Sequence, residues 1–222
     1  MSVAPPIERR PRHDPVTPTE ALRAAFGSGR LPCRRIGLLG GSFNPAHEGH
    51  RHVSLWAMRA LGLDEVWWLV SPQNPLKPRR DMADLAARVA SARAAARHAR
   101  IRVGALESLI GTMYTVDTLA WLRRSSPRTR FVWLMGADNL AQIHCWEGWT
   151  RIFHAVAIAV LDRPTYSLRA TASVAARRFA RRRRRGREAK LLAAASLPAW
   201  ILLHGRRHAA SATAIRASAR TA

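Results

Sequence analysis

Short apolar runs alternate with longer amphipathic stretches between residues 35 and 203 of this 222-residue chain. Each apolar run is bounded by glycine, proline or charged residues, a pattern typical of a strand that is buried on both faces. The pattern predicts six such strands, at residues 35–39, 66–70, 101–103, 131–135, 155–161 and 199–203.

The stretches between these runs carry helical patterns. From Val53 to Leu61 apolar residues recur at spacings of three and four, which marks one face of a helix, and Gly62 is placed to end it. Further helices are predicted at residues 81–98, 116–124 with Thr115 as the N-cap, 138–153 with a break near Gly148, 168–195 and 211–219.

This alternation predicts an α/β fold, a Rossmann-like doubly wound parallel sheet, because parallel neighbours need crossover connections that cover both faces. In such a sheet the ligand binds beyond the carboxyl ends of the strands. Gly40 and Gly41 after the first predicted strand, and Gly136 after the fourth, fall at that edge. We place a single domain at residues 31–222 and expect residues 1–30, rich in proline and arginine, to be a disordered, mobile extension.

The formal net charge of +23 favours a polyanionic partner, either nucleic acid, an anionic membrane or phosphorylated small molecules. Much of the charge lies in residues 177–187, RRFARRRRRGR, which we interpret as a solvated helix face. Phe179 is the one aromatic residue in that run, so the stacking platforms of a nucleic-acid-binding protein are missing and no specific nucleic acid is expected. Charge alone does not choose between the partners.

Composition argues against several other classes of protein. No apolar run approaches the ~20 residues that cross a bilayer, and the first 20 residues contain no apolar segment of a secretory signal, so we expect a cytoplasmic protein without a membrane partner. Cys33 and Cys145 lie far apart and form no C-x-x-C pair, which favours two free thiols over a disulfide or a zinc site. The sequence carries no indication of an oligomeric state.

The densest chemical pattern is GGSFNPAHEGH, residues 40–50, which follows the first predicted strand and opens a helix. Glycines let backbone N–H groups approach a phosphate, and a helix N-terminus favours its negative charge. His47 and His50 are three residues apart, so we expect them on one helix face, where two imidazoles can stabilise the charge that develops during phosphoryl-type transfer. A zinc site is the weaker alternative, because H-E-G-H lacks the i, i+4 histidines of a zincin helix.

The segment GSFNPAHEGH resembles the phosphate-binding signature of nucleotidyltransferases that carry an H-x-G-H pattern. Four more segments follow in order and narrow the resemblance to nicotinate-nucleotide adenylyltransferases: SPQNPLKP, MYTVDTL, LMGADNLAQIHCWEGW and SATAIR. The resemblance covers about residues 34–217. It implies an enzyme that transfers AMP from ATP to nicotinate mononucleotide, giving deamido-NAD and pyrophosphate.

The resemblance also implies roles for residues of this chain. His47 and His50 would stabilise the α-phosphate in transit, and Gly136 with Asp138 would hold the ribose of ATP. The remaining ATP-binding residues that it implies are Gly40, Gly41, Ser42, Phe43, Lys77, Ser211, Thr213 and Arg216. Asn44 and Ala212 depart from the residues that are common in the family, Asp and Ser.

The second substrate is expected to contact Thr115 and Trp146. Backbone donors near Thr115 would bind the carboxylate that distinguishes nicotinate from nicotinamide, and Trp146 offers a flat apolar face to a pyridine ring. Core packing is the alternative for Trp146, and because Trp149 lies three residues on, one of the two is expected in the core.

The reaction that this family resemblance implies needs no covalent intermediate, because the phosphate of nicotinate mononucleotide attacks the α-phosphorus of ATP in line. Mg²⁺ is expected as a companion of ATP, bound by substrate oxygens and water, so no protein metal site is predicted. Two alternatives remain open at this point. One is a related transferase acting on nicotinamide mononucleotide or phosphopantetheine, and the other is a nucleic-acid-binding protein that uses the arginine-rich run.

Overall fold

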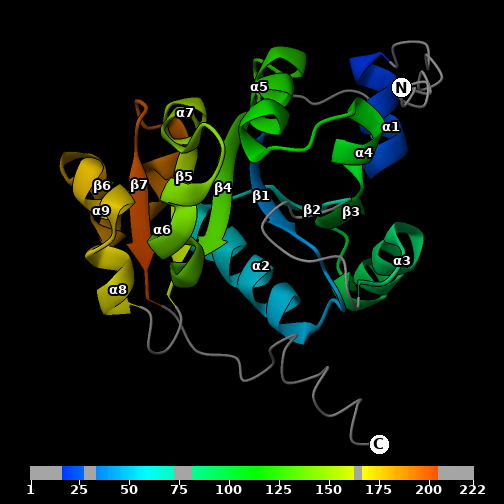
Figure 1. Ribbon diagram of the computed structural model, residues 1–222, viewed down its shortest axis with the longest axis horizontal. Coiled ribbons are helices and arrows are strands. Elements are labelled where there is room, and N and C mark those ends of the chain that lie inside the picture. The colour runs from blue at the N-terminus through cyan, green and yellow to red at the C-terminus, as the bar shows by residue number, and fades with distance from the viewer. Residues whose placement is uncertain (1–16, 28–33, 73–81, 163–166, 205–222) are drawn as a thin grey trace, which may run out of the picture.

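The structure, a computed structural model, describes residues 17–27, 34–72, 82–162 and 167–204 (Figure 1). In this part of the chain seven parallel strands form one sheet in the order β3-β2-β1-β4-β5-β7-β6. Their bounds are β1 Arg35–Gly41, β2 Glu65–Val70, β3 Ile101–Gly104, β4 Arg130–Gly136, β5 Ala157–Leu161, β6 Arg183–Arg184 and β7 Trp200–Leu203. The six predicted strands and the Rossmann-like α/β class are confirmed.

Helices cover both faces of the sheet, as the crossover connections require (Figure 1). One face packs against α1 Pro18–Phe26, α4 Leu106–Ile110, α5 Thr115–Ser125, α6 Ala137–Gln142, the 3₁₀ turn η1 Ile143–Cys145, α7 Trp149–Ala155, α8 Ser167–Thr171 and α9 Val174–Arg178. The other packs against α2 Glu48–Leu61, α3 Leu85–Ala96 and the 3₁₀ segment η3 Gly186–Ala194. Trp67 lies in the first core and Trp68 in the second, which explains why the run EVWWLV has no polar side chain at its centre.

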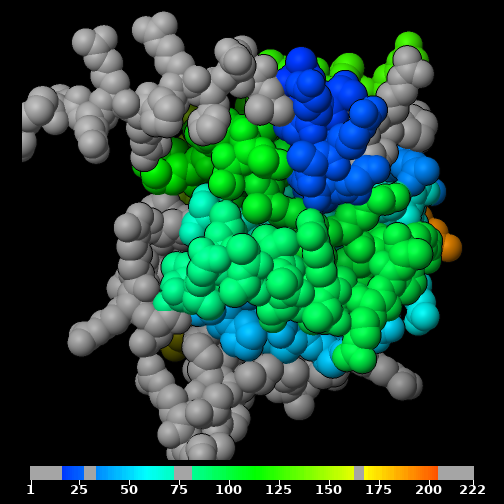
Figure 2. All heavy atoms as spheres, turned by 90° about the vertical axis from the view of Figure 1, so that its right-hand side faces the viewer, coloured from blue at the N-terminus to red at the C-terminus, as the bar shows by residue number. Residues whose placement is uncertain are grey.

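The expectation of a mobile extension is wrong for residues 17–27, because α1 forms there and packs on the domain. Thr17 and Glu20 make a reciprocal capping box, Pro18 is the first helical residue and Gly27 ends the helix at φ 72°. Phe26 stacks on Trp67 with ring centroids 4.1 Å apart. Figure 2 shows α1, in blue, resting against the green segment that contains α4.

The arginine-rich segment does not form the single helix predicted over residues 168–195. It is divided into α8, α9, the 3₁₀ turn η2 Ala180–Arg182, strand β6 and η3. Phe179 packs in the core on one face of the sheet, whereas Ala189 and Leu192 pack on the opposite face. A straight helix cannot pass around the β7 edge between these two cores, so the chain breaks and contributes the short strand β6 at that edge.

Other predicted boundaries hold with small shifts. α2 ends at Gly62, whose φ of 63° is the left-handed conformation of a C-cap. Tyr114 is the N-cap of α5, and Thr115 is the first helical residue instead. The helix predicted over residues 138–153 is split into α6, η1 and α7, with Gly148 at φ 58° just before α7. The predicted helix at residues 211–219 lies outside the described residues. Among the helices that the structure describes, none is long and apolar enough to span a membrane.

Candidate active site

The two glycine-bearing segments singled out in the sequence meet at one point of the sheet. β1 and β4 are neighbours, in register from Arg35 opposite Arg130 to Leu39 opposite Leu134. The chain leaves β1 toward β2 on one side, whereas β4 continues toward β5 on the other, so the sheet order reverses between β1 and β4. This is the position at which open α/β sheets bind ligands beyond their carboxyl ends. Gly41 and Gly136 end these two strands.

Gly40 permits the close packing of an aromatic side chain from β4. A Cβ at position 40 would lie 2.5 Å from Cη2 of Trp133, a distance that van der Waals contact forbids. The glycine is therefore required by the packing of the indole as well as by any approach of a phosphate. The buried Nε1 of Trp133 has no hydrogen-bond partner among the described residues.

The β1–α2 turn, residues 42–47, is anchored in the core by the side chain of Phe43. Phe43 is 2% exposed, stacks on Trp68 at 5.1 Å between ring centroids, and has φ 47°, a left-handed conformation that is uncommon outside glycine. Its side chain belongs to the core, so only its backbone is available for the phosphate contact predicted from the sequence. Ser42 and Asn44 are half-buried on either side of it.

His47 and His50 lie together where α2 begins. His47 is the N-cap of α2 and His50 lies in its first turn, so the two residues do not share a helix face as expected. Their rings are nevertheless in contact, with centroids 3.9 Å apart. Nδ1 of His47 accepts the N–H of Gly49 at 3.1 Å, and Nδ1 of His50 accepts the N–H of His47 at 3.2 Å. Both rings are half-buried, and that of His50 also contacts Phe43 at 4.9 Å.

These hydrogen bonds settle the tautomer of each neutral imidazole. A ring nitrogen that accepts a backbone N–H carries no proton, so the proton of each neutral ring is on Nε2. Each histidine therefore has its donor on the side of the ring away from the helix backbone. This geometry suits hydrogen bonding to a substrate oxygen more than metal binding, and the described residues contain no group of three His, Cys, Asp or Glu side chains that could hold a metal ion.

Gly136 and Asp138 occupy the start of α6 directly beyond β4. Gly136 is the N-cap and Asp138 lies in the first helical turn, half-buried. Since β4 neighbours β1, this pair lies at the same carboxyl edge of the sheet as the β1–α2 turn, with α6 and α2 on opposite faces of the sheet. The role of Gly136 and Asp138 in binding ATP stays a prediction.

Thr115 begins α5, whose N-terminus lacks a side-chain cap. The first-turn hydrogen bonds run from Asp117 and Thr118 to the carbonyl of Tyr114 at 3.1 and 3.2 Å. A helix N-terminus without a side-chain cap favours an anion, and the carboxylate contact near Thr115 stays a prediction.

Trp146 and Trp149 occupy different surroundings. Trp146 is half-buried and meets Trp133 edge to face at 6.5 Å, which connects it to the indole that covers Gly40. Trp149 packs instead on Phe153 and Phe179, at 6.2 and 6.0 Å. Both tryptophans are half-buried and pack against the same core, Trp146 through Trp133 and Trp149 through Phe153 and Phe179, so the structure does not single out one of them as the core residue.

Four predicted ATP-binding residues, Lys77, Ser211, Thr213 and Arg216, lie outside the described residues, as does Cys33. Cys145 is a free, exposed thiol.

Sequence reasoning missed Arg88, a guanidinium that is 3% exposed behind the β1–α2 turn. It donates to the carbonyl oxygens of Ser42, Ser71, Pro72 and Ala83 at 2.7–3.0 Å. The available signal was its spacing, since Arg88 precedes the buried Ala92 and Ala96 by four and eight residues and thus shares their helix face.

Glu107 was also missed. It is 6% exposed, and burial raises the pKa of its carboxyl group to about 7, partly offset by a hydrogen bond from Thr118 at 3.4 Å. Thr118 also bonds Thr112 at 2.9 Å and the carbonyl of Tyr114, which places this acid behind the N-terminus of α5.

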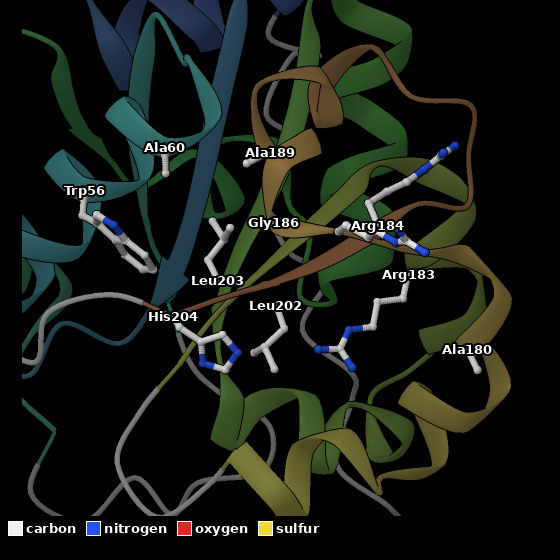
Figure 3. Close-up of a pocket in the computed structure, with 11 residues that line it drawn as sticks. Trp56, Ala60, Ala180, Arg183, Arg184, Gly186, Ala189, Leu202, Leu203 and His204 are labelled. Carbon is white, nitrogen blue, oxygen red and sulfur yellow. The ribbon is translucent and has the colours of Figure 1, made fainter.

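An open cavity of about 840 Å³ lies away from the predicted site (Figure 3). It is lined by Trp56, Arg183, Arg184 and His204 among others, at the β6–β7 edge. The arginines there are exposed, and Arg184 pairs with Glu188 at 3.5 Å. None of the residues predicted to bind substrate lines it, so the crevice between β1 and β4 remains the candidate site.

Comparisons with known proteins show the family. A family model described as cytidylyltransferase-like matches residues 38–218. A relative from Bradyrhizobium sp. (strain ORS 278), named "Probable nicotinate-nucleotide adenylyltransferase", is 53% identical over 182 residues, covering 82% of this chain and 95% of the relative. A relative of the same name from Caulobacter sp. (strain K31) is 52% identical, covering 82% and 96%.

Solved structures resemble the fold. The nicotinic acid mononucleotide adenylyltransferase of Plasmodium falciparum, complexed with NaAD, aligns with a TM-score of 0.61 at 17% identity over 83% of each chain. The same protein complexed with APC aligns with a TM-score of 0.60. At this identity the likeness supports the fold alone.

Proposed function

The chain belongs to the nicotinate-nucleotide adenylyltransferases, and we propose that the crevice between β1 and β4 is where it binds ATP and nicotinate mononucleotide. The protein is a nucleotidyltransferase of NAD biosynthesis that transfers AMP from ATP to nicotinate mononucleotide, with deamido-NAD and pyrophosphate as products. The roles of individual residues in this reaction are our proposals.

The position of the His47–His50 pair is the main support for this site. The two rings lie 3.9 Å apart at the start of α2, directly beyond the β1 strand end that neighbours β4. A triphosphate placed over the β1–α2 turn would meet the N-terminus of α2 and, in the neutral rings, two Nε2–H donors. The adenosine would then lie toward Gly136 and Asp138.

The chemical step that we propose is in-line displacement. A phosphate oxygen of nicotinate mononucleotide forms a bond to the α-phosphorus of ATP while the bond from that phosphorus to the bridging oxygen of pyrophosphate breaks. His47 and His50 would donate hydrogen bonds from Nε2 to α-phosphate oxygens, whose charge redistributes in the transition state. Holding two anions in reach of each other is the main task, and orientation alone can contribute ~7–11 kcal/mol.

For the second substrate, we propose that the α5 N-terminus receives the nicotinate carboxylate and that Trp146 stacks on the pyridine ring. The uncapped first turn of α5 and the exposed part of Trp146 support these roles. A site that hydrogen-bonds a carboxylate discriminates against the corresponding amide, because the amide leaves donors unpaired.

Mg²⁺ is proposed as a companion of ATP. The described residues offer no cluster of acidic side chains for it, so the phosphates and water would supply its oxygen ligands. The ion would neutralise charge on the leaving pyrophosphate. A cytoplasmic location also stays a prediction of the sequence.

The test is pyrophosphate release from ATP and Mg²⁺ in the presence of nicotinate mononucleotide, nicotinamide mononucleotide or phosphopantetheine, supplied separately. We expect rapid release with the acid and at least ~100-fold lower kcat/KM with the amide. Preference for either of the other acceptors would contradict the substrate assignment, and omission of Mg²⁺ is expected to abolish release.

A further inference from the structure

Arg88 is buried, and its hydrogen-bond partners among the described residues include no carboxylate. Its guanidinium donates from Nε to Ala83 at 2.9 Å, from Nη1 to Ser42 and Ser71 at 2.8 and 2.7 Å, and from Nη2 to Pro72 at 3.0 Å. All four acceptors are backbone carbonyls. Burial lowers the pKa of this guanidinium, although Asp84 opposes that shift. A desolvated cation is costly to bury, so its retention behind the turn suggests a role beyond packing.

The four carbonyls come from segments that are far apart in the sequence. Ser42 belongs to the β1–α2 turn, Ser71 and Pro72 follow β2, and Ala83 precedes α3. Two further hydrogen bonds join the same segments, from the N–H of Ser71 to the carbonyl of Gly41 at 3.0 Å and from the N–H of Ala83 to Oδ1 of Asn44 at 3.3 Å. Arg88 contacts all three segments.

The contact with Ser42 fixes the orientation of a peptide group in the turn. The Ser42–Phe43 peptide is trans, so its C=O and its N–H point in opposite directions. Because Arg88 holds the Ser42 carbonyl toward the interior, the Phe43 N–H is directed away from the interior. Phe43 has a left-handed φ of 47°, a conformation that a non-glycine residue keeps only where neighbouring contacts stabilise it. The hydrogen bond from Arg88 to the Ser42 carbonyl is one of those contacts.

We propose that Arg88 is a positioning residue for adenylyl transfer, which holds the β1–α2 turn so that the Phe43 N–H faces the triphosphate of ATP. This proposal rests on the proposed function of the turn. Arg88 touches neither substrate, and its effect passes through the backbone. The fork of the guanidinium is essential, because an ammonium group has three donors at a single point and cannot span four carbonyls with the same geometry.

The experiment compares R88K with R93K and with the wild-type protein. Arg93 lies on the same helix, is exposed, and serves as the matched control for an Arg-to-Lys change. For R88K we expect kcat per folded molecule, with both substrates saturating, to fall roughly ten- to a hundredfold, as small displacements of positioning groups do. R93K should retain the wild-type value. A kcat for R88K within twofold of R93K, with any loss confined to melting temperature, would overturn the proposal.

A second measurement does not depend on whether R88K folds. The backbone amide resonance of Phe43 in the wild-type protein should shift when ATP and Mg²⁺ are added without an acceptor, while that of Ala94 on the exposed face of α3 should not. Absence of a shift at Phe43 would also overturn the proposal. If wild type and R93K both failed to release pyrophosphate, the proposed function would fail, whereas release by both together with an unshifted Phe43 resonance would overturn the proposal for Arg88 alone.

Discussion

The indole ring of Trp133 covers the backbone of Gly40 so closely that a Cβ at position 40 would lie 2.5 Å from Cη2. The two residues are on neighbouring strands, β4 and β1, at the crevice where we place ATP. Trp146 in turn packs edge to face on Trp133. The indole of Trp133 therefore contacts both Gly40, at the proposed phosphate site, and Trp146, at the proposed pyridine site.

Substitution G40A is expected to lower the free energy of unfolding by about 1–3 kcal/mol, since the added methyl group must displace the indole. Denaturant unfolding measures the change. G186A is the matched control, because nothing lies within 4 Å of a Cβ at position 186. Equal stability of the two variants would contradict the contact between Gly40 and Trp133.

Substitution H50A should reduce kcat about 100- to 1000-fold, the loss typical of removing a donor that stabilises transition-state charge, with much less effect on the binding of ATP. Steady-state kinetics and ATP titration separate the two quantities. H154A, at an exposed histidine of α7, provides the control. Parallel losses in turnover and ATP affinity would show that His50 acts in ground-state binding only.

The two tryptophans should respond differently to truncation. W146A is expected to raise KM for nicotinate mononucleotide about fivefold, the equivalent of losing an aromatic contact worth about 1 kcal/mol, with W146F retaining most of the affinity. W149A should instead lower the melting temperature, because its contacts are Phe153 and Phe179. A larger effect of W149A than of W146A on KM would reverse their assignment.

Glu107 should make stability depend on pH near neutrality. Its folded-state pKa of about 7 lies above the ordinary value of 4.5, so between these pH values the folded protein binds the proton more tightly than the unfolded chain. Its stabilising contribution is therefore complete below pH 4.5, declines as the pH rises toward 7, and is lost above it. The shift corresponds to about 3 kcal/mol.

Comparison of the wild-type protein with E107Q isolates this contribution from those of other carboxylates. The difference in unfolding free energy between the two should change by about 3 kcal/mol from pH 4.5 to pH 8, in favour of E107Q at the higher pH. The same difference at every pH would mean that Glu107 titrates normally in the folded state.

The strand pattern and the β1–α2 turn were predictable because their signals are local. Buried runs such as residues 66–70 need only their own composition to be recognised, and Gly62 ends α2 by its own conformation. α1 was predictable in principle, since its capping box, Thr17 with Glu20, lies within four residues. It was missed because no long apolar pattern accompanies that signal.

The amino-acid sequence by itself determined the six long strands in chain order, the spacing of His47 and His50, and the family, because these are properties of neighbouring residues or of ordered motifs. Only the tertiary structure decided which distant groups meet. Arg88 reaches Ser42 across 46 positions, Trp133 covers Gly40, and residues 174–194 pass around the β7 edge from one core to the other. Each of these depends on the sheet order and register, which arise from packing the whole domain and leave no mark in any single segment.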